Sequence, residues 1–381
     1  MHEVDAAGLG IGDDHPPRIM GVLNVSEESP YDPSVYDDPG AAAAYVDETL
    51  LAEGADIVDV GLESANKRFE VLSPEAELER LETALEVLGS VSGDPVFSIE
   101  TRYHEVAEAA LSRGFDMVND VCGFADPEMP AVCAAHDAAV VKMASPPDLE
   151  RPGALETVED IYAALRREGL TEKTIVDPAF GGWSEGKTLE DDRETLRRLR
   201  EFRALDRPIL VSINRKNFLR KLANRSTEAA LPVSLAATAM AVERGAHVIR
   251  THDVAETRDA AVVGDAFTRD RVRDPAHGVE ELDVTTVREA TRYLGTAGED
   301  GGSERGGAGR AVARTVRLSG LSPPARRELR ALAADHGLIV AETGPDVVLA
   351  GPVDALESLC DADLEDPDLA AVVPVIRDVG R

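Results

Sequence analysis

The sequence has no long hydrophobic run. Its longest apolar stretch, residues 229–242, is interrupted by Pro232, Ser234 and Thr238 and is shorter than the roughly 20 residues that a membrane-spanning helix needs. The N-terminus carries neither a basic flank nor an apolar segment of the kind found in secretory signals. We therefore expect no membrane helix and a cytoplasmic protein.

Cysteine is scarce as well. The chain has three, Cys122, Cys133 and Cys360, and none of them falls in a CxxC or CxxH spacing. An odd number of cysteines without paired spacing argues against both a disulfide framework and a zinc site. We expect reduced thiols that are mostly buried.

Positive charge is in short supply. The 381 residues include 72 Asp and Glu but only 40 Lys and Arg, which gives a formal net charge of −32. The only lysines are Lys67, Lys142, Lys173, Lys187, Lys216 and Lys221. Such a chain repels DNA, RNA and anionic lipid, which excludes a nucleic-acid or membrane partner. An acidic surface with Arg in place of Lys is typical of a high-salt cytoplasm, where salt screens the repulsion between carboxylates, so we expect a halophilic source.

What the sequence does contain is an alternation of short β-branched runs with longer amphipathic stretches. The predicted strands are Ile19 to Asn24, Asp56 to Gly61, Val96 to Ile99, Asp116 to Asn119, Ala138 to Met143, Thr174 to Asp177, Ile209 to Ile213 and His247 to Thr251. This pattern is typical of a parallel α/β fold with crossover helices. Eight such units in about 250 residues, with no GxGxxG after the first strand, favour a (β/α)8 TIM barrel over a doubly wound sheet.

Capping residues support this interpretation. Helix starts are expected at Ser73-Pro74, Thr188 and Thr227, and helix ends at Gly54, Gly114 and Gly245. Ser and Thr side chains accept bonds from the first helical N–H groups, and proline fits the first turn. Glycine adopts the left-handed conformation that returns the chain to the sheet.

The composition divides the chain into five parts. We expect an N-terminal tail (1–17), the barrel (18–270), a helical extension (271–295), a glycine-rich linker (296–310) and a small C-terminal α/β appendage of unknown role (311–381). The linker prediction rests on six glycines and the lack of sizeable apolar groups between 296 and 310.

The residues that follow the predicted strands are all polar. They are Asn24, Glu63, Glu100, Asn119, Lys142, Asp177, Lys216 and Arg250 with His252. Barrel enzymes take their catalytic residues from the C-terminal ends of several strands. Most of the lysines, namely Lys67, Lys142, Lys187, Lys216 and Lys221, lie in or near the expected strand-to-helix loops. In so acidic a chain, local positive charge indicates a site for an anionic, phosphorylated molecule.

Seven segments of the chain resemble dihydropteroate synthase. In order along the chain they are 19–25, 54–61, 98–101, 119–123, 175–178 followed by 186–188, 214–218 and 250–254. The resemblance covers residues 18 to 268 and does not extend into the C-terminal appendage. It implies a transferase of folate biosynthesis that joins hydroxymethyl-dihydropterin pyrophosphate to p-aminobenzoate or a related arylamine, releases pyrophosphate, and uses Mg2+. It also implies a homodimer.

By the same resemblance, Asp177, Asn119 and Glu100 hydrogen-bond the pterin ring, with Lys216 beside it. The chemistry agrees, because a pterin edge presents N–H donors next to a carbonyl acceptor and therefore suits a carboxylate paired with an amide.

A second group of residues is expected to bind the pyrophosphate end of the substrate. The resemblance implies that Asn24, Arg250 and His252 hold the pyrophosphate and its metal, with Asn24 as the metal ligand. Negative charge grows on pyrophosphate as its C–O bond breaks, so Mg2+ and cationic side chains stabilise the transition state more than the ground state. The expected catalytic residues are Lys216, Arg250 and His252. The expected substrate-binding set also includes Glu63 and Asn214.

The chain departs from the family pattern at several places. Glu100 replaces an aspartate, Asn214 replaces a serine near the aminobenzoate carboxylate, and Ala65 and Asn66 stand where the family has Thr and Arg. Loops 24–32 and 179–185 also differ. We interpret the chain as a divergent dihydropteroate synthase or a paralogue that acts on a related pterin or arylamine.

Two other functions stay open at this point. Related pterin-binding barrels transfer a methyl group to a corrinoid protein, although the pair Arg250 and His252 favours a reaction that releases pyrophosphate. Alternatively the barrel binds a pterin without turnover, having lost the Thr and Arg of the second loop.

Overall fold

The computed structural model describes residues 1–25, 34–36, 38–63, 71–148, 152–181, 186–274, 276–295 and 307–377. The chain divides into two compact units, Met1–Asp270 and Arg271–Arg381. Within the described ranges, no helix combines the length and the apolar character needed to cross a membrane.

Eight parallel strands form the centre of the first unit. In chain order they are β3 (Arg18–Asn24), β4 (Ile57–Gly61), β5 (Val96–Thr101), β6 (Met117–Asp120), β7 (Ala139–Met143), β8 (Thr174–Asp177), β9 (Leu210–Val211) and β10 (Val248–Thr251). They are arranged β8-β7-β6-β5-β4-β3-β10-β9. A parallel bridge between Val176 and Ile209 joins the two ends of the sheet and closes it. The predicted (β/α)8 barrel is confirmed.

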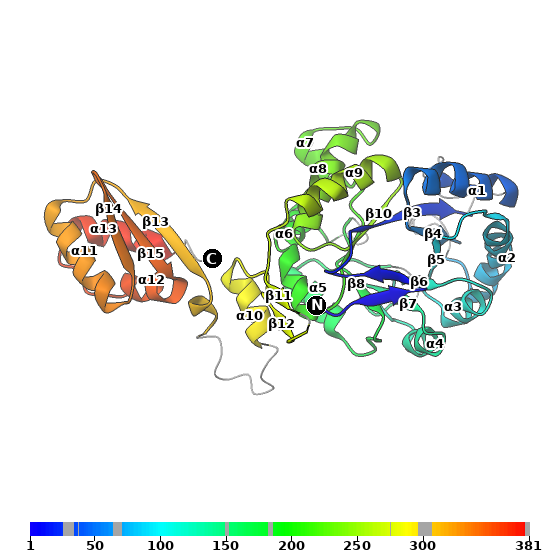
Figure 1. Cartoon of the computed structure of the whole chain (residues 1–381), viewed down its shortest axis with the longest axis horizontal. Coiled ribbons are helices and arrows are strands. Elements are labelled where there is room, and N and C mark those ends of the chain that lie inside the picture. The colour runs from blue at the N-terminus through cyan, green and yellow to red at the C-terminus, as the bar shows by residue number, and fades with distance from the viewer. Residues whose placement is uncertain are drawn as a thin grey trace. The chain divides into compact units, whose positions relative to one another are not determined.

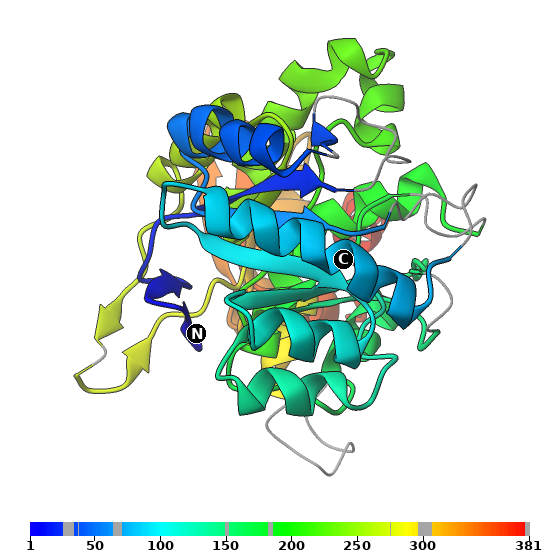
Figure 2. The ribbon, with the colours of Figure 1, turned by 90° about the vertical axis from the view of Figure 1, so that its right-hand side faces the viewer.

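Helices connect successive strands and lie outside them (Figure 1; Figure 2). They are α1 (Pro39–Tyr45), α2 (Pro74–Ser90), α3 (His104–Leu111), α4 (Met129–Ala135), α5 (Val158–Arg166), α6 (Leu189–Arg197), α7 (Asn217–Ala223), α8 (Leu231–Glu243) and α9 (Val254–Ala266). A π-helical turn, Val46–Leu51, continues α1, and a 3-10 helix, Leu199–Leu205, follows α6. Parallel strands require such crossover connections.

The predicted helix ends agree with the structure with one exception. Ser73 accepts a bond from the Ala76 N–H at 3.3 Å with Pro74 in the first turn, and Thr188 forms a capping box with Asp191. The three predicted closing glycines, Gly54, Gly114 and Gly245, have φ of 98°, 110° and 99°. The prediction for Thr227 is wrong: it precedes a 3-10 turn, Glu228–Ala230, and its side chain makes no capping bond.

An apolar layer fills the barrel near the N-terminal ends of the strands. It consists of Met20, Ile57, Val96, Met117, Ala139, Val141, Ile175, Leu210 and Val248, together with Val4, Ala6 and Ile11. The last three belong to a hairpin of β1 (Val4–Ala6) and β2 (Leu9–Ile11). The expected N-terminal tail is therefore partly a hairpin that covers this end of the barrel, because its apolar side chains complete the interior layer.

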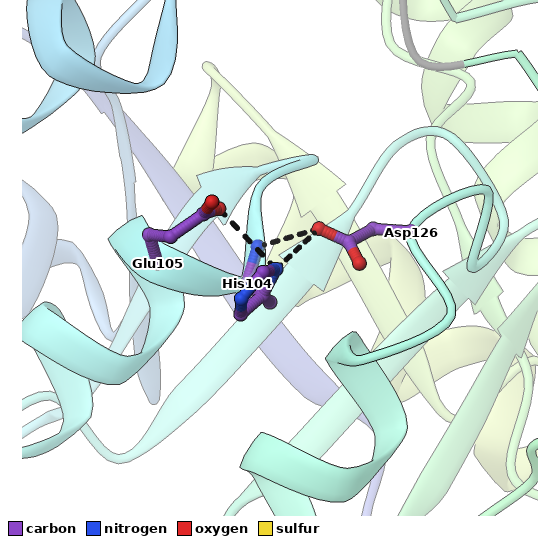
Figure 3. A group of neighbouring side chains, drawn as sticks. All are labelled: His104, Glu105 and Asp126. Carbon is purple, nitrogen blue, oxygen red and sulfur yellow. Dashed lines mark hydrogen bonds and ion pairs between the residues drawn. The ribbon is translucent and has the colours of Figure 1, made fainter.

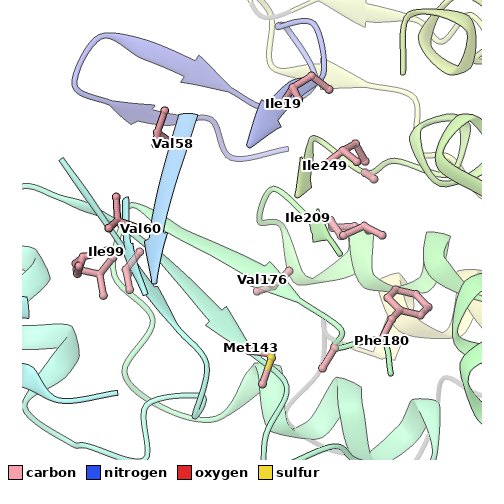
Figure 4. Packing of buried hydrophobic residues seen from close by; sticks show 14 of the residues in the cluster. Ile19, Val58, Val60, Ile99, Met143, Val176, Phe180, Ile209 and Ile249 are labelled. Carbon is pink, nitrogen blue, oxygen red and sulfur yellow. The ribbon is translucent and has the colours of Figure 1, made fainter. Parts of the chain in front are cut away.

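Side chains of the opposite strand face form a second core between the strands and the helices. Figure 4 shows Ile19, Val58, Val60, Ile99 and Val176 in this cluster. They alternate along the strands with the interior residues, as the two-residue period of a β-strand requires. Burying each large apolar side chain contributes roughly 1.5–3 kcal/mol.

Lys142 lies on this outer face and not at the open end of the barrel. It follows the interior residue Val141 in β7, and its Nζ donates to the Arg167 carbonyl at 3.0 Å and stands 5.0 Å from the centre of the Phe124 ring. Burial lowers the pKa of Lys142 to about 8. The expectation that Lys142 belongs to the strand-end group is wrong, because a shift of one residue along a strand turns a side chain to the other face.

The second unit contains a three-stranded antiparallel sheet and three helices that share one core. The strands β13 (Ala313–Leu318), β14 (Ile339–Thr343) and β15 (Asp346–Pro352) are ordered β13-β15-β14. The helices are α11 (Pro323–Asp335), α12 (Val353–Cys360) and α13 (Pro367–Ile376). The apolar run 338–349 is thus two strands, because Gly344, with φ of 67°, allows the chain to reverse.

The segment before this sheet also belongs to the second unit. It holds the short strands β11 (Arg273–Asp274) and β12 (Val279–Glu280) and the helix α10 (Val287–Gly295). Residues Ala308–Arg310, which we expected in the linker, form a 3-10 turn. Ala308 is buried with Ala290 and Val353, so this end of the predicted linker is packed, while residues 296–306 lie outside the described ranges.

Candidate active site

A polar layer lies one step farther along the strands than the apolar layer of the barrel interior. Asp59, Ser98, Asn119, Asp177 and Arg250 come two residues after Ile57, Val96, Met117, Ile175 and Val248, respectively. Residues two apart on a strand point to the same face. Five strands therefore direct polar side chains into the barrel above a closed apolar floor.

Asp59 is the centre of this layer. Its Oδ1 accepts a bond from Ser98 Oγ at 2.7 Å, and its Oδ2 accepts bonds from Asn119 Nδ2 at 3.0 Å and Arg250 Nε at 2.7 Å. Strand β4, which carries Asp59, neighbours neither β6 nor β10, so the last two bonds cross the interior. The strand-end criterion did not select Asp59, although a carboxylate inside the apolar run 57–61 is a usable sequence signal.

Arg250 also pairs with Glu100. Its Nη2 donates to Glu100 Oε2 at 2.5 Å, so one guanidinium joins Glu100 to Asp59. Burial and the neighbouring charge of Asp59 raise the pKa of Glu100, although Arg250 opposes this effect. The longer side chain of Glu100 thus reaches the arginine on β10.

Asp177 stands at the end of β8 with its carboxylate held in place. Its Oδ1 accepts a bond from the Ala179 N–H at 2.7 Å, and Ala179 has a φ of 59°. Burial raises the pKa of Asp177 to about 6, while the nearby charges of Lys216 and Arg250 act in the opposite direction. The group is an ionised hydrogen-bond acceptor at neutral pH and loses that charge in mild acid.

Lys216 lies beside these groups and is half-buried. Burial and the positive charge of Arg250 lower the pKa of Lys216. Gly181 approaches it closely: a Cβ on this glycine would lie 3.3 Å from Lys216 Nζ. The same loop is supported by Lys187, whose Nζ donates to the Ala179 carbonyl at 2.6 Å and pairs with Asp192 at 3.1 Å.

We expect Gly181→Ala to lower turnover with a modest loss of stability. The glycine has a φ of 115°, which an L side chain rarely adopts, and the added methyl group would push Lys216 from its place. The backbone strain costs about 1–3 kcal/mol. Steady-state kinetics and thermal unfolding measure the two effects.

Gly89→Ala is the matched control for this change. Gly89 lies in α2 with nothing within 4 Å of the added Cβ, so this variant should keep full turnover. Unchanged turnover of Gly181→Ala would show that Lys216 is not held by this contact.

His252 is a neutral imidazole at neutral pH. Burial and the adjacent positive charge of Arg250 lower the pKa of His252 to about 3. Lys216 and Arg215 also place positive charge near this half-buried ring, whereas Asp253 acts in the opposite direction. His252 therefore offers hydrogen bonds and no charge to an anionic ligand.

Asn214, Asn24 and Glu63 occupy the edge of the site. Asn214 Nδ2 donates to Asp253 Oδ2 at 2.8 Å, and Asn24 Nδ2 donates to Ser34 Oγ at 3.0 Å. Glu63 forms an ion pair with the buried Arg102 and accepts a bond from the Leu72 N–H at 3.1 Å. Glu63 thus connects the chain after β4 to Arg102, which follows β5.

The structure joins the predicted site residues to different degrees. One hydrogen-bonded network contains Asn119, Arg250 and Glu100. A second group interacts with Arg250 through charge and consists of Asp177, Lys216 and His252. The remaining predicted residues are bonded to other side chains, and they are Asn214, Asn24 and Glu63. Lys67, the altered positions Ala65 and Asn66, and most of loops 24–32 and 179–185 lie outside the described residues.

Comparison with known proteins agrees with the resemblance seen in the sequence. The profile of the pterin-binding enzyme family matches residues 20–252. A probable bifunctional folylpolyglutamate synthase/dihydropteroate synthase from Halobacterium salinarum is 35% identical over 260 residues; the match covers 65% of this chain and 31% of that relative. The chain therefore spans only about a third of the length of that relative.

Solved structures match the barrel over its whole length. A dihydropteroate synthase from Coxiella burnetii in complex with pteroic acid is 28% identical with a TM-score of 0.58, and the match covers 69% of this chain and 98% of that one. The dihydropteroate synthase from Thermus thermophilus in complex with 4-aminobenzoate is 32% identical with a TM-score of 0.56, and the match covers 70% and 99% of the two chains. The chain belongs to the pterin-binding enzyme family, and within that family its barrel matches the dihydropteroate synthases.

Proposed function

We propose that this chain condenses hydroxymethyl-dihydropterin pyrophosphate with p-aminobenzoate, or a related arylamine, and releases pyrophosphate in folate biosynthesis. The observation that carries the proposal is the polar layer in which Asp59 bonds both Asn119 and Arg250, with Asp177 and Lys216 close enough to interact through charge. The similar enzymes from Coxiella burnetii and Thermus thermophilus hold pteroic acid and 4-aminobenzoate, respectively.

Asp177 and Asn119 suit the hydrogen-bonding edge of a pterin. An ionised Asp177 accepts bonds from ring N–H groups, and an amide both donates and accepts. Asn119 Nδ2 is engaged by Asp59, which leaves the Asn119 carbonyl oxygen as the acceptor that faces a ligand. Both side chains are held by bonds within the protein, so little conformational entropy is lost on binding.

Arg250, Lys216 and His252 suit the pyrophosphate end of the substrate. Arg250 and Lys216 bring positive charge, and the neutral His252 brings a hydrogen bond. In the reaction the arylamine nitrogen bonds to the pterin methylene while the C–O bond to pyrophosphate breaks, and the amine proton passes to solvent. Charge that grows on the leaving oxygen is stabilised most where donors are fixed in advance and water is excluded.

Asn24 fits the role of a magnesium ligand. Its Nδ2 donates to Ser34 Oγ, so its Oδ1 is the amide's acceptor atom, and this oxygen lies only 2.8 Å from where a Cβ on Gly61 would stand. The glycine thus makes room for the amide at the end of β4. Mg2+ is held by few protein oxygens together with substrate phosphates and water; bound there, it would neutralise charge on pyrophosphate.

The direct test is incubation of the full chain with the pterin pyrophosphate, Mg2+ and p-aminobenzoate in molar salt. We expect pyrophosphate release that depends on the arylamine, measured by a coupled phosphate assay, and a pteroate product identified by mass. Pterin binding without release with any arylamine would favour the non-catalytic alternative. Methyl transfer to a corrinoid protein without pyrophosphate would replace the proposal.

We also propose a homodimer formed through α8 and α9. Met240, Val262, Val263 and Phe267 are exposed apolar residues on or next to these two helices, which pack together at Gly264 and Ala239. Grouped exposed apolar side chains are typical of protein interfaces.

Phe267→Asp is expected to shift the dimer to monomer, because it places a charge on a side chain that is 79% exposed in the single chain. Light scattering after gel filtration measures the mass. Ile339→Asp, on a residue of β14 that is 68% exposed, is the control and should leave the mass unchanged. A monomeric parent chain would contradict the proposal.

A cytoplasmic location is consistent with the thiols. Cys122, Cys133 and Cys360 are free, and the first two are buried. Free thiols are the rule in a reducing compartment, so we propose that the enzyme acts there.

A further inference from the structure

Three metal-binding types of side chain meet outside the candidate active site. His104 begins α3, Glu105 follows it, and Asp126 lies between β6 and α4. Figure 3 shows the two carboxylates directed toward the imidazole of His104. His104 Nδ1 is 2.8 Å from Asp126 Oδ2 and 3.3 Å from Glu105 Oε2, and the three atoms all lie within 4.8 Å of one another.

Asp126 is fixed before any ion arrives. Its Oδ2 accepts a bond from the His104 N–H at 3.0 Å, its Oδ1 accepts one from the Glu128 N–H at 3.1 Å, and the residue is buried. Groups that hold a ligand in its orientation strengthen metal binding. Binding an ion here would therefore order only the partly exposed His104 and Glu105 side chains.

The spacing of the atoms suits a small divalent ion. Ligands at 2.0–2.1 Å from tetrahedral Zn2+ are about 3.3 Å apart, and the two distances from His104 Nδ1 are 2.8 and 3.3 Å. A small side-chain movement is enough to admit the ion. A metal binds an imidazole nitrogen that carries no proton, so binding of the ion releases any proton on Nδ1.

The local charge attracts a cation. The charged groups with the largest effect on the His104 ring are Asp126, Glu105 and Glu128, and all are carboxylates. Carboxylates grouped in this way favour a divalent ion.

We propose that His104, Glu105 and Asp126 bind a divalent transition-metal ion, with Zn2+ as the probe of choice. One imidazole nitrogen with two carboxylate oxygens is a donor set that suits Zn2+, whereas Mg2+ prefers oxygen alone. Water completes the coordination. The ion joins the loops after β5 and β6, the two strands that carry Glu100 and Asn119, and the site does not depend on the proposed reaction.

The test is metal binding by the full chain without an affinity tag. The protein is stripped with a chelator, then titrated with Zn2+ by calorimetry in molar NaCl with millimolar Mg2+, which occupies weak sites on the acidic surface. We expect one Zn2+ per chain. His104→Ala and Glu105→Gln should weaken binding by more than the roughly 10- to 100-fold that loss of an outer ligand partner costs.

His136→Ala is the matched control. His136 Nε2 is 3.0 Å from Glu108 Oε2, a distance similar to those around His104, but here the imidazole is paired with a single carboxylate. Removal of the His136 imidazole should therefore leave the Zn2+ affinity unchanged. Because the Glu105 side chain is half exposed, the Glu105→Gln variant should fold normally. A change at Asp126 would instead remove the acceptor for the His104 N–H at the start of α3. No stoichiometric Zn2+, or equal affinity in parent and His104→Ala, would overturn the proposal.

Discussion

Replacing Asp177 with asparagine is expected to weaken pterin binding by at least about 30-fold. Burial and the bond from the Ala179 N–H hold the carboxylate in place at the end of β8, and asparagine would turn an N–H2 donor toward the ring N–H groups. Each buried donor without an acceptor costs about 1–3 kcal/mol. Two such groups weaken binding by at least about 30-fold, which calorimetry with pteroic acid measures.

Asp116→Asn is the matched control for this change. Asp116 Oδ2 accepts a bond from the Phe97 N–H at 2.9 Å immediately before β6, at the opposite end of the barrel. This variant should lose some stability and keep its affinity for the pterin. Equal affinity of the Asp177→Asn variant and the parent chain would remove Asp177 from the site.

The same carboxylate predicts a pH dependence. Burial raises the pKa of Asp177 to about 6, so the group is ionised above that pH and protonated below it. Only the ionised form accepts bonds from ring N–H groups, so pterin affinity should be constant above about pH 7 and fall about tenfold per unit below about pH 6. Asp177→Asn should remove this dependence.

Removing the Asp59 carboxylate is expected to have the largest effect on stability. Asp59→Ala leaves Ser98, Asn119 and Arg250 without their shared buried acceptor. Loss of one partner of a buried ion pair costs about 3–5 kcal/mol. Urea unfolding in molar salt measures this loss, and it should far exceed that of Ser98→Ala, which removes one hydroxyl donor from the same carboxylate.

Asp59→Asn separates positioning from folding. The amide keeps the volume of Asp59 but cannot accept from both Asn119 and Arg250 with a charged oxygen. We expect a folded chain with weaker pterin affinity and a lower kcat, because Asn119 and Arg250 would both lose the charged oxygen that orients them. If kcat falls in proportion to stability across the Asp59 and Ser98 variants, Asp59 has only a structural role.

The strands and their order along the chain were predictable because their signals are local. Each predicted strand overlaps an observed one, since a short β-branched run ends where a glycine or a polar residue interrupts it. Gly54, Gly114 and Gly245 close their helices as predicted, because a left-handed residue is needed there and glycine adopts it without strain. The N-terminal hairpin escaped prediction because strands of three residues are too short to show a period.

The site was predictable only in part. Polar residues at strand ends marked Asn119, Asp177 and Arg250, but the same criterion selected Lys142, which faces outward. It also passed over Asp59, which lies inside a strand. Distance from a strand end does not say which face a side chain occupies, and that face decides whether it meets the ligand or the helices.

The sequence by itself determined the barrel, the family and the acidic surface, because strand alternation, glycine positions and charge are properties of neighbouring residues. Only the tertiary structure decided that Asp59 joins Asn119 to Arg250, that Glu100 pairs with that arginine, and that His252 is neutral. Closing the barrel brings together strands that are far apart in the chain and removes water from between their side chains. Bonds across the interior and shifted pKa values arise from that closure.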